Sequence, residues 1–221
     1  MTKVKICGIT NLEDALMAVR YGADMLGFNF YPESPRYIAP GASREITKKL
    51  TETIKRPVRA VGVFVNESLD DVLRIAIDTD ITVIQLHGNE SPGYFENVHL
   101  GSGGLDVIKA FRAKSLSIED IECYGIRELA EHFEMTGVLI DAYSAAVYGG
   151  SGEVADWKFA REVSEKFPSV YLAGGLNANN VADAIRAVRP FAVDVASGVE
   201  SSPGKKDPKK VEAFIRNAKS V

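Results

Sequence analysis

The chain has 221 residues, of which 46% are hydrophobic and 25% charged, with a formal net charge of −4. This composition excludes collagen-like, low-complexity and largely disordered chains. No apolar run approaches the roughly 20 residues of a membrane helix, and no apolar segment of signal-peptide length follows Met1. A mildly acidic chain without a basic block is a poor binder of nucleic acid or of an anionic membrane. Cys7 and Cys123 do not make a secreted disulfide framework, so we expect a cytoplasmic protein.

Short apolar segments rich in β-branched residues alternate along the chain with segments of helical spacing. Several are near-continuous hydrophobic runs, which are typical of strands buried on both faces. In chain order, the predicted strands are residues 3–7, 25–30, 58–65, 82–87, 106–111, 137–141, 169–173 and 192–196.

Helices are predicted where apolar residues recur at intervals of three and four. Such spacing follows Asn11, Ser68 and the stretch 177–180, and Asn and Ser are good N-caps. The last helix is expected to begin near Asp207 and Pro208, with proline in its first turn. The fourth unit is the weakest, because residues 91–100 predict only a short, poorly patterned helix.

About eight strand–helix units of roughly 28 residues each indicate an α/β protein, a single-domain (β/α)8 TIM barrel over residues 1–221. The alternative is an open, doubly wound sheet of five or six strands with a small extra domain. The Gly- and Pro-rich stretches 31–41, 101–104, 148–152 and 201–205 are short and evenly placed. They are therefore predicted to be loops of one domain and not linkers.

In such barrels the catalytic residues lie at the carboxyl ends of the strands and in the loops that follow. Loops after the seventh and eighth strands commonly bind phosphate through backbone N–H groups. Here these loops hold Gly174, Gly175, Ser197 and Gly198, whose backbone a ligand can approach closely. The alternative is that the glycines only make tight turns. Walker and G-x-G-x-x-G patterns do not occur, which favours a small sugar phosphate over a nucleotide.

Three reactive side chains end other predicted strands. Cys7 is either a small buried hydrophobe or a nucleophile or base whose pKa, ordinarily about 8.5, is tuned toward neutrality. Asp141 follows an apolar run, where a low dielectric would favour a general acid, or it caps the next loop. His87 contacts substrate or hydrogen-bonds its own loop. No metal site is predicted, because His87, His99 and His132 lack ligand spacing.

Six motifs in this order carry a resemblance to a known family. They are KVKICGIT (3–10), SPR (34–36), QLHG (85–88), LID (139–141), LAGGL (172–176) and DVASGVE (194–200). Over essentially its whole length the chain resembles the phosphoribosylanthranilate isomerases of tryptophan biosynthesis. The fold of that family is a (β/α)8 barrel, in agreement with the count of units.

The resemblance implies an Amadori rearrangement of N-(5-phosphoribosyl)anthranilate to 1-(2-carboxyphenylamino)-1-deoxyribulose 5-phosphate by general acid–base catalysis, without cofactor or metal. It implies that Asp141 protonates the ribose ring oxygen and that Cys7, as thiolate, removes the proton from C2. Arg36 would contact the anthranilate carboxylate, where the alternative is an arginine on the loop surface, and His87 would lie in the substrate site. Asp194 would reach the ribose hydroxyls or brace the loop near the phosphate. The loops at 174–175 and 197–198 would bind the phosphate.

Departures from the family pattern fall outside these positions. The stretches 101–104 and 115–127 are longer than expected, and residues 143–148 replace the usual small and charged residues. Barrels that also act on a histidine-pathway aminoaldose phosphate carry aspartate as the first-strand base, so Cys7 favours the tryptophan-only branch.

Two other functions compete with the isomerase. One is a sugar-phosphate enzyme resembling the epimerases, which would need a metal or opposed carboxylates. The other is a phosphosugar-binding module that keeps only the phosphate loops. For the isomerase we expect a small-molecule substrate as partner, neither nucleic acid nor membrane, and a monomer or homodimer.

Overall fold

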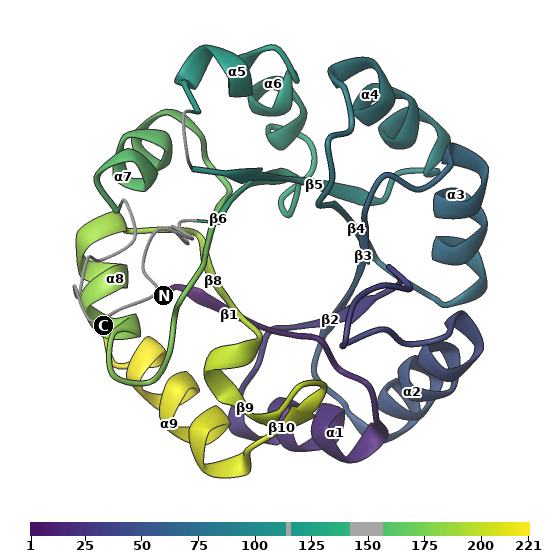
Figure 1. Cartoon of the computed structure of the whole chain (residues 1–221), viewed down its shortest axis with the longest axis vertical. Coiled ribbons are helices and arrows are strands. Elements are labelled where there is room, and N and C mark those ends of the chain that lie inside the picture. The colour runs from purple at the N-terminus through teal and green to yellow at the C-terminus, as the bar shows by residue number, and fades with distance from the viewer. Residues whose placement is uncertain (114–115, 142–156) are drawn as a thin grey trace.

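Eight apolar segments form eight parallel strands, each hydrogen-bonded to the next, and β8 closes on β1 (Figure 1). This computed structural model describes residues 1–113, 116–141 and 157–221. The strands are β1 (Lys3–Cys7), β2 (Met25–Asn29), β3 (Arg59–Phe64), β4 (Val83–Leu86), β5 (Asp106–Arg112), β6 (Gly137–Asp141), β7 (Val170–Ala173) and β8 (Ala192–Val195). Every strand end lies within one residue of its prediction. The (β/α)8 barrel is therefore confirmed, and the open doubly wound sheet is wrong.

Helices surround the barrel in the described part of the chain. They are α1 (Leu12–Tyr21), α2 (Pro40–Thr53), α3 (Leu69–Asp78), α4 (Pro92–Gly101), α5 (Ile118–Glu122), α6 (Ile126–Ala130), α7 (Trp157–Lys166), α8 (Val181–Val188) and α9 (Pro208–Lys219). The Asn11 side chain accepts a hydrogen bond from the amide of Asp14, and Ser68 accepts one from Asp71, so both predicted N-caps are confirmed.

The weakest helical unit is the fifth and not the fourth. Helix α4 has ten residues, the same length as α1, and Ser91 caps it by accepting a hydrogen bond from the amide of Tyr94. The fifth unit instead holds two helices of five residues each, α5 and α6. Gly125 separates them in the left-handed conformation, with a φ of 62°, which glycine adopts at little cost.

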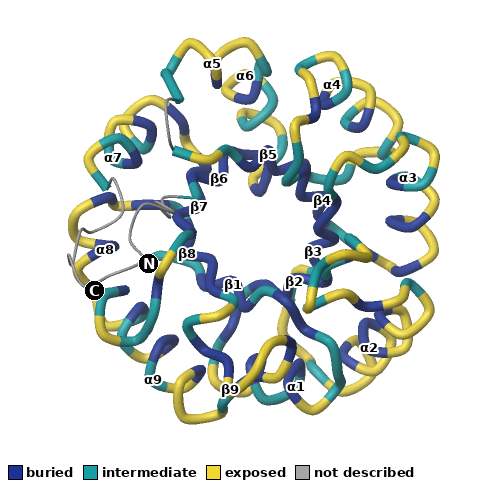
Figure 2. Tube along the Cα trace, in the orientation of Figure 1, coloured by how far each residue is buried: buried dark blue, intermediate teal, exposed yellow. Residues whose placement is uncertain are grey.

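Apolar side chains form two layers because successive residues of a strand point to opposite faces. The outer layer, between strands and helices, includes Val4, Ile6 and Leu26. The inner layer fills the barrel and includes Met25 and Tyr171. Figure 2 shows the buried residues concentrated along the barrel wall and the exposed ones on the outer surfaces of the helices. The loops at the carboxyl ends of the strands therefore rest on a packed scaffold.

A short antiparallel hairpin follows β8 and corrects one expectation. The stretch 201–205 was predicted to be a loop, but only the turn at 203–204 is one. The residues on either side belong to strands β9 (Glu200–Ser202) and β10 (Lys205–Lys206), which follow the 3₁₀ turn η1 (Ser197–Val199). Gly204, between the two strands, has a φ of 78°. The hairpin returns the chain to the carboxyl end of the barrel before α9 begins. In the described ranges, no helix is both long and apolar enough to cross a membrane.

Candidate active site

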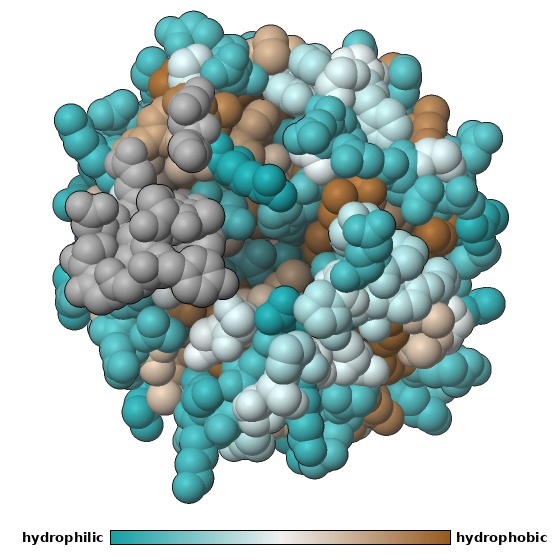
Figure 3. Space-filling view, in the orientation of Figure 1, coloured by the Kyte–Doolittle hydropathy of each residue, from teal (hydrophilic) through white to brown (hydrophobic). Residues whose placement is uncertain are grey.

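A cavity of about 440 Å³ opens at the carboxyl ends of the strands. It is lined by all nine residues that the sequence predicts for the site. They are Cys7, Arg36, His87, Asp141, Gly174, Gly175, Asp194, Ser197 and Gly198. Figure 3 shows a predominantly hydrophilic face of the molecule that is hollowed at its centre. Residues as distant in sequence as Cys7 and Gly198 thus share one cavity.

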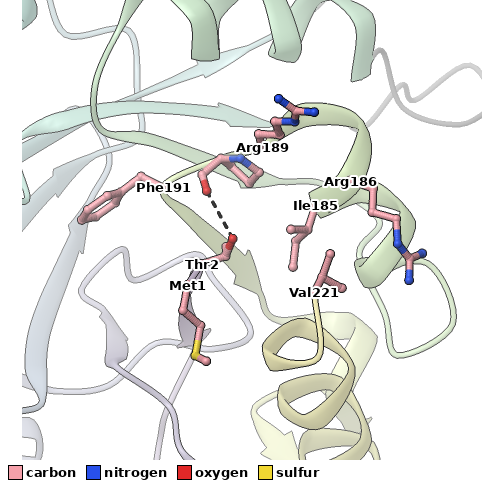
Figure 4. Close-up of a pocket in the computed structure, with 8 residues that line it drawn as sticks. Met1, Thr2, Ile185, Arg186, Arg189, Phe191 and Val221 are labelled. Carbon is pink, nitrogen blue, oxygen red and sulfur yellow. Dashed lines mark hydrogen bonds between the residues drawn. The ribbon is translucent and has the colours of Figure 1, made fainter.

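A second, larger cavity of about 550 Å³ lies beside the chain termini (Figure 4). The described residues that line it are Met1, Thr2, Ile185, Arg186, Arg189, Pro190, Phe191 and Val221. None of these eight has a thiol, carboxylate or imidazole side chain. Its side chains therefore offer none of the acid–base groups that Cys7, His87 and Asp141 bring to the smaller cavity, which is the candidate active site.

Cys7 ends β1, and its thiol fits beside a glycine of the neighbouring strand. Gly27 of β2 is its partner in the sheet register, and a Cβ built on Gly27 would lie 2.7 Å from the Cys7 Sγ. Burial raises the pKa of the Cys7 thiol, and the charges of Lys5 and Lys206 only partly offset that rise. The expected tuning of this pKa toward neutrality is therefore wrong for the ligand-free site, because desolvation outweighs the nearby cations.

We expect Gly27→Ala to lower kcat about 10- to 100-fold, because the added methyl group displaces the thiol and misplacement by about 1 Å can cost that much. Gly41→Ala in α2 is the matched control, since its added Cβ meets nothing within 4 Å. Steady-state kinetics and thermal unfolding of both variants check this. An unchanged kcat in a folded Gly27→Ala variant would show that the position of the thiol does not matter.

A buried charged network lies beneath Cys7, and the sequence did not reveal it. The Lys5 Nζ donates to the Gln85 Oε1 at 2.7 Å and to the Asp194 Oδ2 at 2.9 Å. Burial lowers the pKa of Lys5, but the charge of Asp194 and the contact with Cys7 outweigh burial, and the pKa is raised. The other Asp194 oxygen, Oδ1, is buried and has no hydrogen-bond partner in the described structure. An unpaired buried acceptor on the cavity wall is suited to a ligand hydroxyl.

His87 and Asp141 face each other across the ends of β4 and β6. Their closest atoms, Nε2 and Oδ2, lie 4.0 Å apart, and the side chains are 27% and 29% exposed. Burial lowers the pKa of His87, so the imidazole is neutral near pH 7. Of the apolar run before Asp141, Val138 and Ile140 point outward into the layer under the helices, whereas Leu139 lies in the inner layer, on the same face as Asp141. The unusual residues 143–148 that follow lie outside the described residues.

Arg36 is held by a carboxylate of the hairpin. Its Nε and Nη2 donate to the two carboxylate oxygens of Glu200 at 2.8 and 2.7 Å, a bidentate contact that fixes the guanidinium plane. Lys206 donates to the same carboxylate at 2.9 Å and to the backbone oxygen of Cys7 at 2.5 Å. Burial would raise the pKa of Glu200, but the hydrogen bonds from Arg36 and Lys206 lower it. Within the described ranges, the Arg36 Nη1 makes no hydrogen bond to a protein group.

Neither Glu200 nor Lys206 was singled out from the sequence, although Glu200 ends the DVASGVE motif. The hairpin brings them to Arg36, which lies 164 residues away from Glu200 along the chain. A signal was present in the SSPGKK stretch (201–206), where Pro-Gly between polar residues is typical of a turn.

Glycine is required by geometry in both loops that follow β7 and β8. Gly174 and Gly175 have φ values of 89° and 65°, which side chains rarely allow. A Cβ on Gly198 would lie 1.9 Å from the backbone oxygen of Leu176, so the two loops touch there. Ser197 begins the 3₁₀ turn η1 in the second loop. The loops thus present closely packed backbone to the cavity.

The described residues contain no group of three His, Cys, Asp or Glu side chains that could hold a metal ion. Cys123, which the sequence did not place in the site, is an exposed free thiol after α5. The chemistry available in the cavity is therefore proton transfer by Cys7, Asp141 and His87, with Arg36 and the glycine loops suited to anionic groups.

Comparison with known proteins identifies the family of the chain. Residues 4–217 match the family model of N-(5'-phosphoribosyl)anthranilate (PRA) isomerase. The chain is 48% identical to the N-(5'-phosphoribosyl)anthranilate isomerase of Trichlorobacter lovleyi over 221 residues, 100% of both chains. It is similar to the crystal structure of phosphoribosyl anthranilate isomerase from Thermotoga maritima, with a TM-score of 0.83, 42% identity and 100% coverage of both chains.

A second solved phosphoribosyl anthranilate isomerase matches with a TM-score of 0.79, 40% identity and 100% coverage of both chains. That protein is in complex with reduced 1-(o-carboxyphenylamino)-1-deoxyribulose 5-phosphate, a small molecule. The similarity covers the full length of both the chain and these relatives, and the chain belongs to the N-(5'-phosphoribosyl)anthranilate isomerase family.

Proposed function

We propose that the 440 Å³ cavity binds N-(5-phosphoribosyl)anthranilate and converts it to 1-(2-carboxyphenylamino)-1-deoxyribulose 5-phosphate, with Asp141 as general acid and Cys7 as general base. The observation that carries the proposal is the meeting of both groups with Arg36 and two glycine loops in one cavity. An aldose–ketose rearrangement needs one acid and one base, and neither bond hydrolysis nor net oxidation occurs.

The acid acts first. The Asp141 carboxyl gives its proton to the ribose ring oxygen as the bond between that oxygen and C1 breaks. The electron pair of the broken bond stays on the oxygen, and the nitrogen lone pair forms the C1=N bond of a cationic Schiff base. His87, whose Nε2 lies 4.0 Å from the Asp141 Oδ2, is one polar group beside it.

The base acts second. The Cys7 thiolate takes the proton from C2, the C–H electron pair forms a C1=C2 bond, and the C=N electron pair returns to nitrogen. The resulting enolamine becomes the ketone when C1 gains a proton and the C2 hydroxyl loses one. The thiol then holds one extra proton and Asp141 lacks one, and exchange with water restores both for the next turnover.

The remaining site residues would hold the substrate. The free oxygen of Asp194 can accept a hydrogen bond from a ribose hydroxyl. The free Nη1 of Arg36 can donate to the anthranilate carboxylate while Glu200 holds the other side of the guanidinium. Backbone amides around Gly174, Gly175, Ser197 and Gly198 would bind the phosphate, as helix N-termini and turns do in other barrels.

We also expect the enzyme to work in the cytoplasm, since Cys7 and Cys123 are both free thiols. The expected monomer or homodimer stays a prediction. Light scattering of the purified protein over a range of concentrations would decide between the two states.

Turnover of the anthranilate substrate by purified protein, before and after treatment with a metal chelator, tests the proposed function. We expect activity that the chelator leaves unchanged, because ring opening and the removal of the C2 proton are both assigned to side chains. Activity that is lost with chelator and restored by added zinc or magnesium would instead support the metal-dependent sugar-phosphate enzyme. Tight binding of the substrate without turnover would support the binding module. Complementation of a tryptophan auxotroph that lacks this isomerase extends the test to the cell.

A further inference from the structure

Lys5 is a fully buried lysine that the acid–base chemistry does not use. It comes from β1 two residues before Cys7, so both side chains point into the barrel, and its exposed fraction is 0%. Lysine is almost never fully buried unless it is paired. Its ammonium donates to Gln85 and to Asp194, and Cys7 lies two residues further along the same face of the strand. Two of the three N–H groups of Lys5 are therefore held by side chains at the cavity floor, on the side of the barrel where Cys7 ends β1.

The same ammonium determines how a chain of hydrogen bonds is oriented toward Asp141. A lysine has only donors, so the Gln85 group 2.7 Å from Nζ is its oxygen. The Gln85 amide nitrogen then donates to the His87 Nδ1 at 2.8 Å. A neutral imidazole that accepts at Nδ1 carries its proton on Nε2, the atom that faces Asp141 at 4.0 Å.

We propose that Lys5 is a positioning residue that holds a positive charge beneath Cys7 and, through Gln85, directs the N–H of His87 toward Asp141. The Lys5 ammonium would thus stabilise the thiolate form of Cys7. Through Gln85 it would also keep the imidazole proton of His87 on Nε2, the nitrogen that faces Asp141. This inference rests on the proposed roles of Cys7 and Asp141 in the isomerisation.

The charges around Cys7 single out Lys5 among the nearby cations. The charged groups facing the thiol are Lys5 on β1, Asp194 on β8, Lys206 on β10 and, in the loop after β2, Arg36. Arg36 and Lys206 both bond to the carboxylate of Glu200, which balances part of their charge. Lys5 also bonds to a carboxylate, but it shares a strand and a face with Cys7, and its charge lowers the pKa of the thiol more than that of Lys206 does.

The pH dependence of Cys7 alkylation tests the inference without relying on turnover. In a Cys123→Ser background Cys7 is the single thiol, and its reaction with iodoacetamide follows the thiolate fraction. We expect Lys5→Met to raise the pKa of the Cys7 thiol by about 1–3 units, because an opposite charge at such range shifts a pKa by that much. At a pH below the thiol pKa, alkylation would slow about tenfold or more.

Lys3→Met is the matched control, because it removes the same charge from the same strand. Lys3 pairs with Glu134 and lies four residues before Cys7, roughly 13 Å along the strand. We expect its alkylation profile to match that of the parent. Gln85→Met should also leave the thiol pKa unchanged while lowering kcat, since it interrupts only the link from Lys5 to His87.

Lys5→Met leaves Asp194 buried without its cation, so the variant has a route to misfolding that is unrelated to the thiol. The double variant Lys5→Met/Asp194→Asn removes both charges, so no unpaired carboxylate is left buried and the thiol can be tested in a folded protein. We expect its thiol pKa to stay above that of the parent, because Lys5 acts on the thiol more strongly than Asp194 does.

An alkylation profile like that of the parent, in whichever of the two variants folds, overturns the inference. This outcome differs from a failure of the proposed function. Full turnover by Cys7→Ser would show that Cys7 is not the base, while the alkylation rates would still report whether Lys5 controls the thiol.

Discussion

Cys7→Ser is expected to lower kcat about 10²- to 10⁴-fold, the usual contribution of a general base. The serine hydroxyl is close in size to the thiol and fits against Gly27, so the barrel should fold and bind substrate as before. A hydroxyl, however, scarcely ionises near neutral pH and cannot take the proton from C2. Steady-state kinetics on the anthranilate substrate, with KM close to that of the parent, would show a loss confined to the chemical step.

The pH dependence of kcat/KM in the parent enzyme also tests whether Cys7 is the general base. The base acts when deprotonated, and burial raises the pKa of the Cys7 thiol above its ordinary value. Thiolate is therefore scarce at neutral pH. Because Asp141 must also keep its proton to act as the acid, kcat/KM should follow a bell-shaped pH profile and not a continuous rise to the thiol pKa. The residual activity of Cys7→Ser, which has no thiol to ionise, should only fall as the pH rises.

Cys123→Ser is the control for both measurements, because Cys123 is the exposed thiol outside the cavity. We expect its kcat and its pH profile to equal those of the parent. Turnover of Cys7→Ser close to that of the parent would remove Cys7 from the proposed mechanism.

The strands and most of the cavity lining were predictable because both can be recognised from short stretches of sequence: an apolar run for the strand, and the residues that end it for the cavity. A strand buried on both faces is a short apolar run, and in a parallel barrel all carboxyl ends meet at one face. The residues that end those runs, such as Cys7 and Asp141, therefore had to converge. The glycines after β7 and β8 could also be predicted as site residues from the sequence. Gly174 and Gly175 adopt left-handed backbone conformations, and at Gly198 the two loops are too close for a side chain.

The charged contacts beneath and beside the cavity were not predictable, because their partners are distant in sequence. Lys5 and Asp194 are 189 residues apart, and Lys5 lies in a strand that also holds the half-exposed Lys3. Burial of one lysine and partial exposure of the other depend on depth in the barrel, which periodicity does not encode. Arg36 and Glu200 met only because the hairpin after β8 returns to the barrel mouth.

Asp141→Asn is expected to lower kcat about 10²- to 10⁴-fold, because the amide keeps the shape of the carboxyl group but cannot give up a proton to the ring oxygen. The neutral His87, whose Nε2 lies 4.0 Å from the Asp141 carboxylate, does not replace it, since a neutral imidazole is a far weaker acid than a carboxyl group. Asp78→Asn, the same change at a 57% exposed position at the end of α3, is the matched control and should leave kcat unchanged.

Substrate deuterated at C2 separates the acid from the base. Loss of the acid slows ring opening, so in Asp141→Asn the C–H cleavage that follows no longer limits the rate, and the isotope effect on kcat/KM should fall toward unity. Loss of the base slows the C–H cleavage itself, so in Cys7→Ser the isotope effect should be at least as large as in the parent. Cys7 at the end of β1 and Asp141 at the end of β6 are proposed to act on different bonds. Equal isotope effects in the two variants would therefore contradict the assignment of Asp141 to ring opening and of Cys7 to C–H cleavage.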